Sequence, residues 1–202
     1  MIRKWILICW LILIFGGISF LFWHNEWKYS LPTPVPQNYH PVEPGTLISI
    51  KNVLKPGDTS KPVLLHFFNP DCPCSRFNIT HFKSLVKQYD SKINFVIIAL
   101  LGNGKSYTSK DIQERFDLSV PVLFDSAIAA SCGVYSTPQA ALIGADHRLY
   151  YRGNYNKSRY CTDKKSNYAQ MAIDSLLDKN AGPSFGDAAI KSYGCELPVC
   201  NK

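Results

Sequence analysis

Apolar positions fall into a few long runs along this chain, and the first of them lies at the amino terminus. From Trp5 to Trp23 no side chain is ionisable apart from the thiol of Cys9. A helix needs about 20 such residues to cross the hydrocarbon core of a membrane. Arg3 and Lys4 precede the run, and the positive-inside bias therefore predicts a cytoplasmic amino terminus with the rest of the chain exported.

A cleaved signal peptide would also begin with positive charge followed by an apolar run. Here the run is longer than the roughly 7 to 15 residues that such peptides use, and residues 19–25 (SFLFWHN) offer no small-x-small cleavage site. We therefore favour an uncleaved anchor. We expect a cytoplasmic stub at 1–4 and a single-pass anchor at 5–23 in the inner (cytoplasmic) membrane. The carboxyl-terminal domain should lie in the periplasm or another extracytoplasmic space.

A proline-rich segment follows the anchor. Residues 31–45 (LPTPVPQNYHPVEPG) contain five prolines, a density that excludes helix and favours extended polyproline geometry. We expect residues 24–60 to form a linker and an amino-terminal arm. A stiff spacer would hold the domain away from the bilayer, whereas an ordered arm would pack along the domain.

The hydrophobic pattern then predicts a strand, a helix and a second strand. Residues 63–69 (VLLHFFN) form a short apolar run bounded by proline, which is typical of a buried strand. Residues 75–89 place apolar side chains at helical spacing with lysines on the other face. Residues 93–102 (INFVIIALLG) are continuous and rich in β-branched side chains, as expected of a second buried, parallel strand.

The second half of the chain predicts shorter elements. We expect a helix over 109–116 capped by Ser109, a strand over 120–124 and one or two helical turns over 126–132. Residues 138–143 and 148–152 flank a turn and predict an antiparallel hairpin. A last helix is predicted over 165–177, because helical spacing places a set of apolar side chains on one face: Tyr168, Met171, Ala172, Leu176 and Leu177. The pattern indicates an α/β layered domain over 61–180, with parallel strands first, a hairpin at the edge and helices on both faces, followed by a cysteine-containing tail at 181–202.

Candidate chemistry concentrates in residues 71–75 (DCPCS). Cys72 comes just after a predicted buried strand and just before a predicted helix. The unpaired N–H groups and positive dipole end of a helix amino terminus stabilise an anion, so this position favours a thiolate. Lowering a cysteine pKa from about 8.5 toward neutrality produces the nucleophile that attacks disulfides. Pro73 suits the first helical turn, which has no use for the missing N–H.

Two separated motifs resemble the thioredoxin-like superfamily, and in particular its redoxin and TlpA-like branch of membrane-tethered periplasmic proteins. They are HFFNPDCPCSRFN at 66–78 and STPQAALIGADHRLYYRGNYN at 136–156. The resemblance implies a thioredoxin-like fold with a central mixed sheet flanked by helices. It also implies a cis peptide bond at Pro138 beside the reactive cysteine, with the backbone of Thr137 pairing with a substrate chain.

The site departs from the Cys-x-x-Cys pattern of thioredoxin, because Ser75 stands in the place of the second cysteine and Cys74 comes one residue early. Either Cys72 and Cys74 form a disulfide, or Cys72 acts alone through a mixed disulfide. We favour the pair, with Cys72 attacking and Cys74 resolving. The resulting hypothesis is a thiol–disulfide oxidoreductase acting on exported protein thiols or disulfides. A reducing role would need a separate membrane electron donor.

Four further cysteines follow in the exported part. Cys161, Cys195 and Cys200 are candidates for structural disulfides, either as a local Cys195–Cys200 bridge or with Cys161 tying the tail to the domain body. Spacing does not choose between these pairings. Cys132 is expected to be a buried small hydrophobic residue.

Two other functions remain open. A peroxiredoxin-like thiol peroxidase normally carries Thr or Ser three residues before its cysteine, where this chain has Asn69. A Cu(I)-binding or delivery protein would use Cys72 and Cys74 as soft ligands, completed by His66 or His81. We expect no resident cofactor or metal. The net charge of +7 is scattered, without the basic and aromatic stripe of a nucleic-acid groove, so nucleic-acid binding is not expected.

Overall fold

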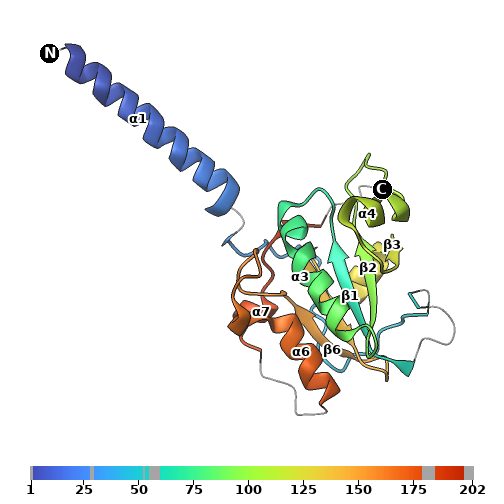
Figure 1. Ribbon diagram of the computed structural model, residues 1–202. Coiled ribbons are helices and arrows are strands. Elements are labelled where there is room, and N and C mark those ends of the chain that lie inside the picture. Colours follow the sequence, from blue (N-terminus) through green and yellow to red (C-terminus); the bar gives the residue numbers. More distant parts are fainter. Residues whose placement is uncertain (1, 28–29, 52, 55–59, 179–184, 198–202) are drawn as a thin grey trace.

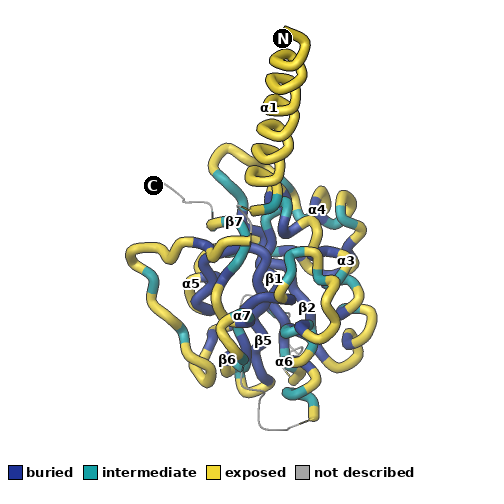
Figure 2. Tube along the Cα trace, turned by 90° about the vertical axis from the view of Figure 1, so that its left-hand side faces the viewer, coloured by how far each residue is buried: buried dark blue, intermediate teal, exposed yellow. Residues whose placement is uncertain are grey.

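An isolated apolar helix precedes the folded domain in the computed structural model, which describes residues 2–27, 30–51, 53–54, 60–178 and 185–197. Helix α1 (Ile2–Phe22) continues into one π-helical stretch (Trp23–Trp27) and has no buried residue. Within the described ranges, this is the one helix that is long and apolar enough to cross a membrane. It projects from one end of the domain and is exposed along its length (Figures 1 and 2).

The centre of the domain is a five-stranded mixed sheet with the order β3-β2-β1-β5-β6. Strands β1, β2 and β3 run parallel to one another, whereas β5 is antiparallel to both β1 and β6. The bounds are β1 Val63–Phe68, β2 Asn94–Ala99, β3 Val122–Leu123, β5 Gln139–Ile143 and β6 Leu149–Gly153. All side chains of β1 are buried, because this strand lies in the middle of the sheet with a layer on each face.

The layer on one face is built from helices that pack against even-numbered side chains of β1. Helices α3 (Pro73–Tyr89), α4 (Ser109–Phe116) and α6 (Tyr168–Leu177) contribute to this core, with Leu64 and Phe68 from the strand. The other face carries α5 (Ser126–Ser131) and arm residues such as Ile48 and Ile50. This parallel βαβ unit, joined to an antiparallel hairpin and covered on both faces, is a thioredoxin-like fold, as the family resemblance implies (Figure 1).

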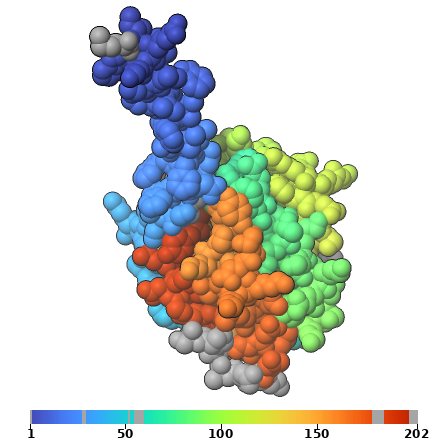
Figure 3. Space-filling model, turned by 60° about the vertical axis from the view of Figure 1, so that its left-hand side comes forward, coloured from blue at the N-terminus to red at the C-terminus, as the bar shows by residue number. Residues whose placement is uncertain are grey.

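Within the expected linker and amino-terminal arm (24–60), residues at both ends of the described stretch 30–51 lie against the domain, as an ordered arm would. Thr33 is buried, and its backbone N–H donates to the carbonyl oxygen of Ser192 at 2.9 Å. Ile48 donates to the carbonyl oxygen of His147 at 2.8 Å. In the space-filling view, the arm and the carboxyl-terminal segment lie side by side beneath the anchor (Figure 3).

Two local expectations were wrong. The cap of α4 is Thr108 and not Ser109: the Thr108 side chain accepts from the Asp111 N–H, and the Asp111 carboxylate accepts from the Thr108 N–H, which is a complete capping box. In α6, Met171 is exposed, and the side chains that face the sheet are Ala169, Ala172 and Ile173. The other members of the predicted face, which are Tyr168, Ala172, Leu176 and Leu177, do pack on the core, and α6 begins at Tyr168 and not at residue 165.

A second, small sheet was not predicted. Strand β4 (Ser136–Thr137) pairs antiparallel with β7 (Cys195–Glu196), which follows the short helix α7 (Asp187–Ile190). The tail therefore returns to the domain body at the strand that leads into β5. This contact determines the candidate site.

Candidate functional site

Cys72 lies at the amino terminus of α3, as the sequence predicts. It is the N-cap residue, with extended backbone at φ −81° and ψ 122°, and Pro73 fills the first helical turn. The carbonyl oxygen of Cys72 accepts from the Arg76 N–H at 3.1 Å, which begins the helix. The Sγ atom thus lies at the end of a 17-residue helix, where the dipole favours negative charge when the sulfur is reduced.

The loop before Cys72 is held by short-range hydrogen bonds. The Asn69 N–H donates to Ser75 Oγ at 3.3 Å, and the Asn69 side-chain oxygen accepts from the Asp71 N–H at 2.9 Å. Ser75, which stands where thioredoxin has its second cysteine, therefore ties the loop to the first turn of α3. The Asn69 amide oxygen is engaged within its own turn, so this position, which peroxidases use for Thr or Ser, is occupied by a loop-stabilising contact.

Thr137 and Pro138 lie directly beside the cysteine. The Thr137–Pro138 peptide bond is cis, as the resemblance implies. The Thr137 carbonyl oxygen is 3.6 Å from Cys72 Sγ, and both Thr137 and Cys72 are buried. Because these two residues are separated by 65 positions in the chain, the fold itself brings the helix end and β4 together.

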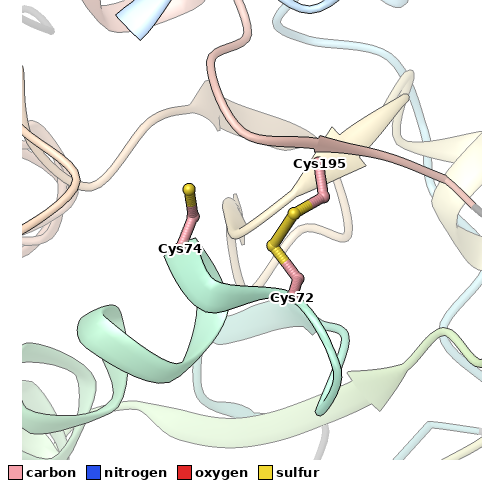
Figure 4. A group of neighbouring side chains, drawn as sticks. All are labelled: Cys72, Cys74 and Cys195. Atoms are coloured by element: carbon pink, nitrogen blue, oxygen red, sulfur yellow. A yellow bond between two sulfur atoms is a disulfide. The ribbon is translucent and has the colours of Figure 1, made fainter. Parts of the chain in front are cut away.

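The sulfur of Cys72 forms a disulfide with Cys195 of β7, over a Cα–Cα distance of 6.1 Å (Figure 4). The expected Cys72–Cys74 bond is absent here, and Cys74 is a free, buried thiol. The expected pairing of Cys195 with Cys161 or Cys200 is likewise not formed: Cys161 is free, and Cys200 lies outside the described residues. The reason is the β4–β7 pairing, which sets Cys195 opposite Thr137 and so within reach of the helix terminus.

Cys74 lies close to this disulfide but points to one side of it (Figure 4). The sulfurs of Cys72, Cys74 and Cys195 all lie within 4.8 Å of one another. Burial raises the pKa of the Cys74 thiol above its usual value, and the nearby Arg159 guanidinium, which hydrogen-bonds to the thiol, offsets part of that rise. Cys74 is thus protonated near neutral pH while remaining close enough for exchange after small movements.

A cavity of about 470 Å³ opens beside Cys74. Its walls come from α3, from the loop over 154–163 and from residues around α7, and it also includes Glu26 and Ser30, which follow the anchor. Cys161 lies in the wall, where its Sγ accepts from Asn78 Nδ2 at 3.1 Å, and burial raises its pKa to about 11. The candidate site is therefore at the end of the domain that faces the anchor.

The two histidines considered for copper do not join the sulfur cluster. His66 is fully buried in the core, where its Nδ1 is 2.8 Å from the Tyr155 hydroxyl and its ring stacks on Phe82. Burial lowers its pKa to about 3, with a smaller contribution from His81. His81 packs against Tyr155. Among the described residues, the one close group of at least three candidate metal ligands consists of the three cysteines.

Cys132 is a buried apolar residue, as expected. It follows α5, has no exposed surface and packs in the core cluster on that face of the sheet. Burial raises its pKa to about 12. The redox candidates therefore separate into a cluster of three sulfurs, one thiol in the cavity wall and one thiol in the core.

The sequence did not identify Cys195 as the disulfide partner of Cys72. The only local signal is Gly194 directly before it, which suits a strand that passes close to another backbone. The spacing of the tail cysteines therefore left the pairing of Cys195 with Cys161 or Cys200 open.

Residues 46–197 match a family model described as a domain of unknown function (DUF6436). No curated protein matches the chain.

Two solved structures share the fold over most of their length. One is a hypothetical protein from Sinorhizobium meliloti 1021, with a TM-score of 0.64 and 18% identity, covering 81% of this chain and 98% of that one. The other is an uncharacterized conserved protein from Geobacillus kaustophilus, with a TM-score of 0.63 and 21% identity, covering 85% and 100%. At these identities the likeness establishes the fold alone.

Proposed function

The chain belongs to the DUF6436 family, and we propose that this member is a membrane-anchored thiol–disulfide oxidoreductase acting outside the cytoplasm on thiols or disulfides of exported proteins. One observation carries the proposal. Cys72, at a helix amino terminus beside a cis proline, is bonded to a cysteine on a strand that pairs with Thr137. That is the arrangement a substrate chain would adopt in a mixed disulfide with Cys72.

The chemistry is a pair of thiol–disulfide exchanges. The Cys72 thiolate attacks one sulfur of a substrate disulfide, forming a mixed disulfide and releasing the other substrate sulfur as a thiolate. A second thiolate of the protein then attacks Cys72 Sγ and expels the substrate, which leaves with two electrons more than it had. In reverse, the same steps oxidise a substrate dithiol. Continued reduction requires a dithiol donor, which for this protein would be a membrane electron donor.

Cys195 and Cys74 are the two thiols near enough for the second step. Cys195 is the one bonded to Cys72, and we assign it the larger part of this role. Cys74 is buried and protonated near neutral pH, because burial raises its pKa, so it attacks more slowly. Its distance of no more than 4.8 Å from both bonded sulfurs still allows it to exchange with either.

The membrane position is part of the proposal. The apolar helix over Ile2–Trp27, with Arg3 and Lys4 at its start, supports a single pass with the domain on the far side of the inner membrane. Glu26, at the end of that helix, accepts hydrogen bonds from Arg159 and from the Tyr160 hydroxyl at 2.7 Å each. These contacts support a site held near the membrane surface.

The test is thiol mapping on the full-length protein in detergent micelles. After equilibration in thiol buffers of graded potential, alkylation and mass spectrometry would identify which cysteines are reduced. We expect Cys72 and Cys195 to open together under mild conditions, and Cys72 to be alkylated near neutral pH in Cys195→Ser. Cys132→Ala is the matched control, since that thiol lies in the apolar core and alanine adds no unpaired polar group there. A Cys72–Cys195 bond that opens only in denaturant would identify a structural bridge and refute the proposal.

Cu(I) binding is a second candidate, favoured by one observation. Once reduced, Cys72, Cys74 and Cys195 present three sulfurs within 4.8 Å of one another, and thiolates are the ligands that select Cu(I). Titration with Cu(I) against a competing chelator should then show one tight site that is lost in Cys74→Ser and in Cys195→Ser alike. Binding that survives Cys195→Ser would exclude this three-sulfur site.

A further inference from the structure

Residues 192–197, here named the tail segment, lie in the groove that would receive a substrate chain. The segment enters β7, whose Cys195 is the antiparallel partner of Thr137 and whose Glu196 is the partner of Ser136. Resting on the proposed function, we infer that the tail segment is a built-in substrate mimic. Substrate takes the place of the tail segment along β4 when it bonds to Cys72, and the segment returns as Cys195 expels the substrate; its sequence therefore shows which chains this place accepts.

Contacts on both sides show that the groove is shaped for an extended strand. On the side of β5, Gln139 Nε2 donates to Ser192 Oγ at 2.6 Å, and both residues are fully buried. On the side of the arm, the Thr33 N–H donates to the Ser192 carbonyl oxygen at 2.9 Å, and Thr33 Oγ1 donates to that of Gly194 at 3.3 Å. The strand is thus held between the arm and β4 by hydrogen bonds that include its backbone.

The position before the cysteine is the most restrictive. A Cβ atom at Gly194 would overlap the carbonyl oxygen of Thr137, and that oxygen belongs to the backbone and cannot move aside. Gly194 also has φ +148°, a conformation that other residues rarely adopt. A polypeptide seated in this way must therefore carry glycine immediately before the cysteine that bonds to Cys72. The inferred substrate class is an extended polypeptide segment containing Gly-Cys.

Tethering makes the tail a strong competitor. A segment joined to the domain by a short connection is present at an effective concentration on the order of millimolar. When Cys195 is bonded to Cys72, the groove is closed covalently. Reduction converts that bond to two thiols, takes two electrons from a dithiol donor, and leaves the tail held only by its hydrogen bonds and packing. Access to the groove is then a competition that substrate can win.

The experiment measures how fast Cys72 reacts with a peptide that copies the tail. The peptide Ser-Tyr-Gly-Cys-Glu-Leu carries its cysteine as a mixed disulfide with thionitrobenzoate, and attack by Cys72 releases the coloured thiolate. Full-length Cys195→Ser in detergent keeps the tail without its bond, and Cys195→Ser/Gly194→Val also prevents seating. We expect at least about a tenfold faster reaction in the double variant. Mass mapping would verify that the adduct is on Cys72.

A peptide with Val in place of Gly tests the substrate class. We expect it to react with the double variant about tenfold more slowly than the Gly peptide, because its Cβ atom meets the Thr137 oxygen. Equal rates for the two peptides would overturn the inferred class. The inference that the tail competes with substrate has its own test. It would be overturned if Gly194→Val changed the peptide rate less than twofold while the circular dichroism spectrum stayed the same.

Two further measurements separate the possible failures. If Gly194→Val does not fold, Ser192→Ala in the Cys195→Ser background serves instead. It removes only the hydrogen bond to Gln139 and should raise the peptide rate about fivefold; a rise of less than twofold would count against the inference. Reaction of Cys195→Ser with glutathione disulfide, which needs no strand groove, tests the proposed function alone. No reaction there refutes the oxidoreductase, whereas reaction without a tail effect refutes only the mimic.

Discussion

Replacing Cys195 with serine should weaken the fold by a measurable amount, because its disulfide closes most of the domain into one loop. The two bonded residues are 123 positions apart. The chain-entropy relation gives a stabilisation of about 5 kcal/mol at 25 °C for a loop of that length. Engineered and natural bridges commonly deliver less, so we expect a loss of about 2 to 5 kcal/mol in the free energy of unfolding.

The assay must follow the domain and not the anchor. All four tryptophans, Trp5, Trp10, Trp23 and Trp27, lie in or directly after the apolar run, so tryptophan fluorescence reports on the anchor. Urea unfolding of the full-length protein in micelles should instead be followed by the near-ultraviolet dichroism of the tyrosines. The wild type without reductant, the wild type with reductant and Cys195→Ser form the necessary set.

Reductant should lower the stability of the wild type to that of Cys195→Ser and leave the variant itself unchanged. Serine is close to cysteine in size, and Cys195 is only partly buried, so loss of packing adds little. A variant within about 1 kcal/mol of the oxidised wild type would refute the reasoning. It would mean that the tail closes the loop without the bond, through the contacts of Ser192 and Thr33 alone.

Three further predictions test the surroundings. His66→Gln should remove part of the pH dependence of stability. Burial lowers the pKa of His66 from 6.5 to about 3, so between those pH values only the unfolded chain binds the proton. From pH 7 to pH 5 the wild type should therefore lose about 2 kcal/mol more of its free energy of unfolding than the variant, as measured by urea unfolding. Asn154→Ala should lower the free energy of unfolding by about 2 kcal/mol, because it removes hydrogen bonds to the carbonyl oxygens of Ala188 and Lys191. It should also speed reduction of the Cys72–Cys195 disulfide in a thiol buffer. An unchanged rate would show that these contacts do not hold the tail in place. Thr108→Ala should lower the free energy of unfolding by about 1 kcal/mol, because it breaks the capping box of α4; thermal unfolding measures the loss, and an unchanged midpoint would contradict the prediction.

The fold was largely predictable because its central strands are continuous apolar runs. The predicted strands over 63–69 and 93–102 match β1 and β2 to within a few residues. A strand that is buried on both faces is apolar along its whole length, and this makes it easy to recognise in a sequence. Strands β4 and β7 were missed for the opposite reason. Each is two residues long, and a pair of that length has no periodicity to detect. Their pairing depends on the tail returning across about 60 residues, which local sequence does not encode.

The candidate site divides in the same way. The position of Cys72 followed from a strand ending where a helix begins, which are local features, and the structure has it there. Its partner did not follow. Cys74 is the nearest cysteine in sequence, but residues two apart at the start of a helix point in different directions, so adjacency along the chain did not translate into a shared bond. Pairing required a sulfur from a facing strand.

Ser75 connects these two outcomes. In the Cys-x-x-Cys arrangement the second cysteine lies one turn along the helix and serves as the partner of the first. Here Ser75 occupies that place, fully buried, and its hydroxyl accepts from the Asn69 N–H to hold the loop that carries Cys72. With that position committed to supporting the loop, a partner for Cys72 must come from elsewhere, and the tail supplies Cys195 on a strand paired with Thr137. A partner on a strand, and not on the helix, lies along Thr137, where the proposed function places a substrate chain, so Ser75 in the helix and Cys195 in the tail are parts of one arrangement.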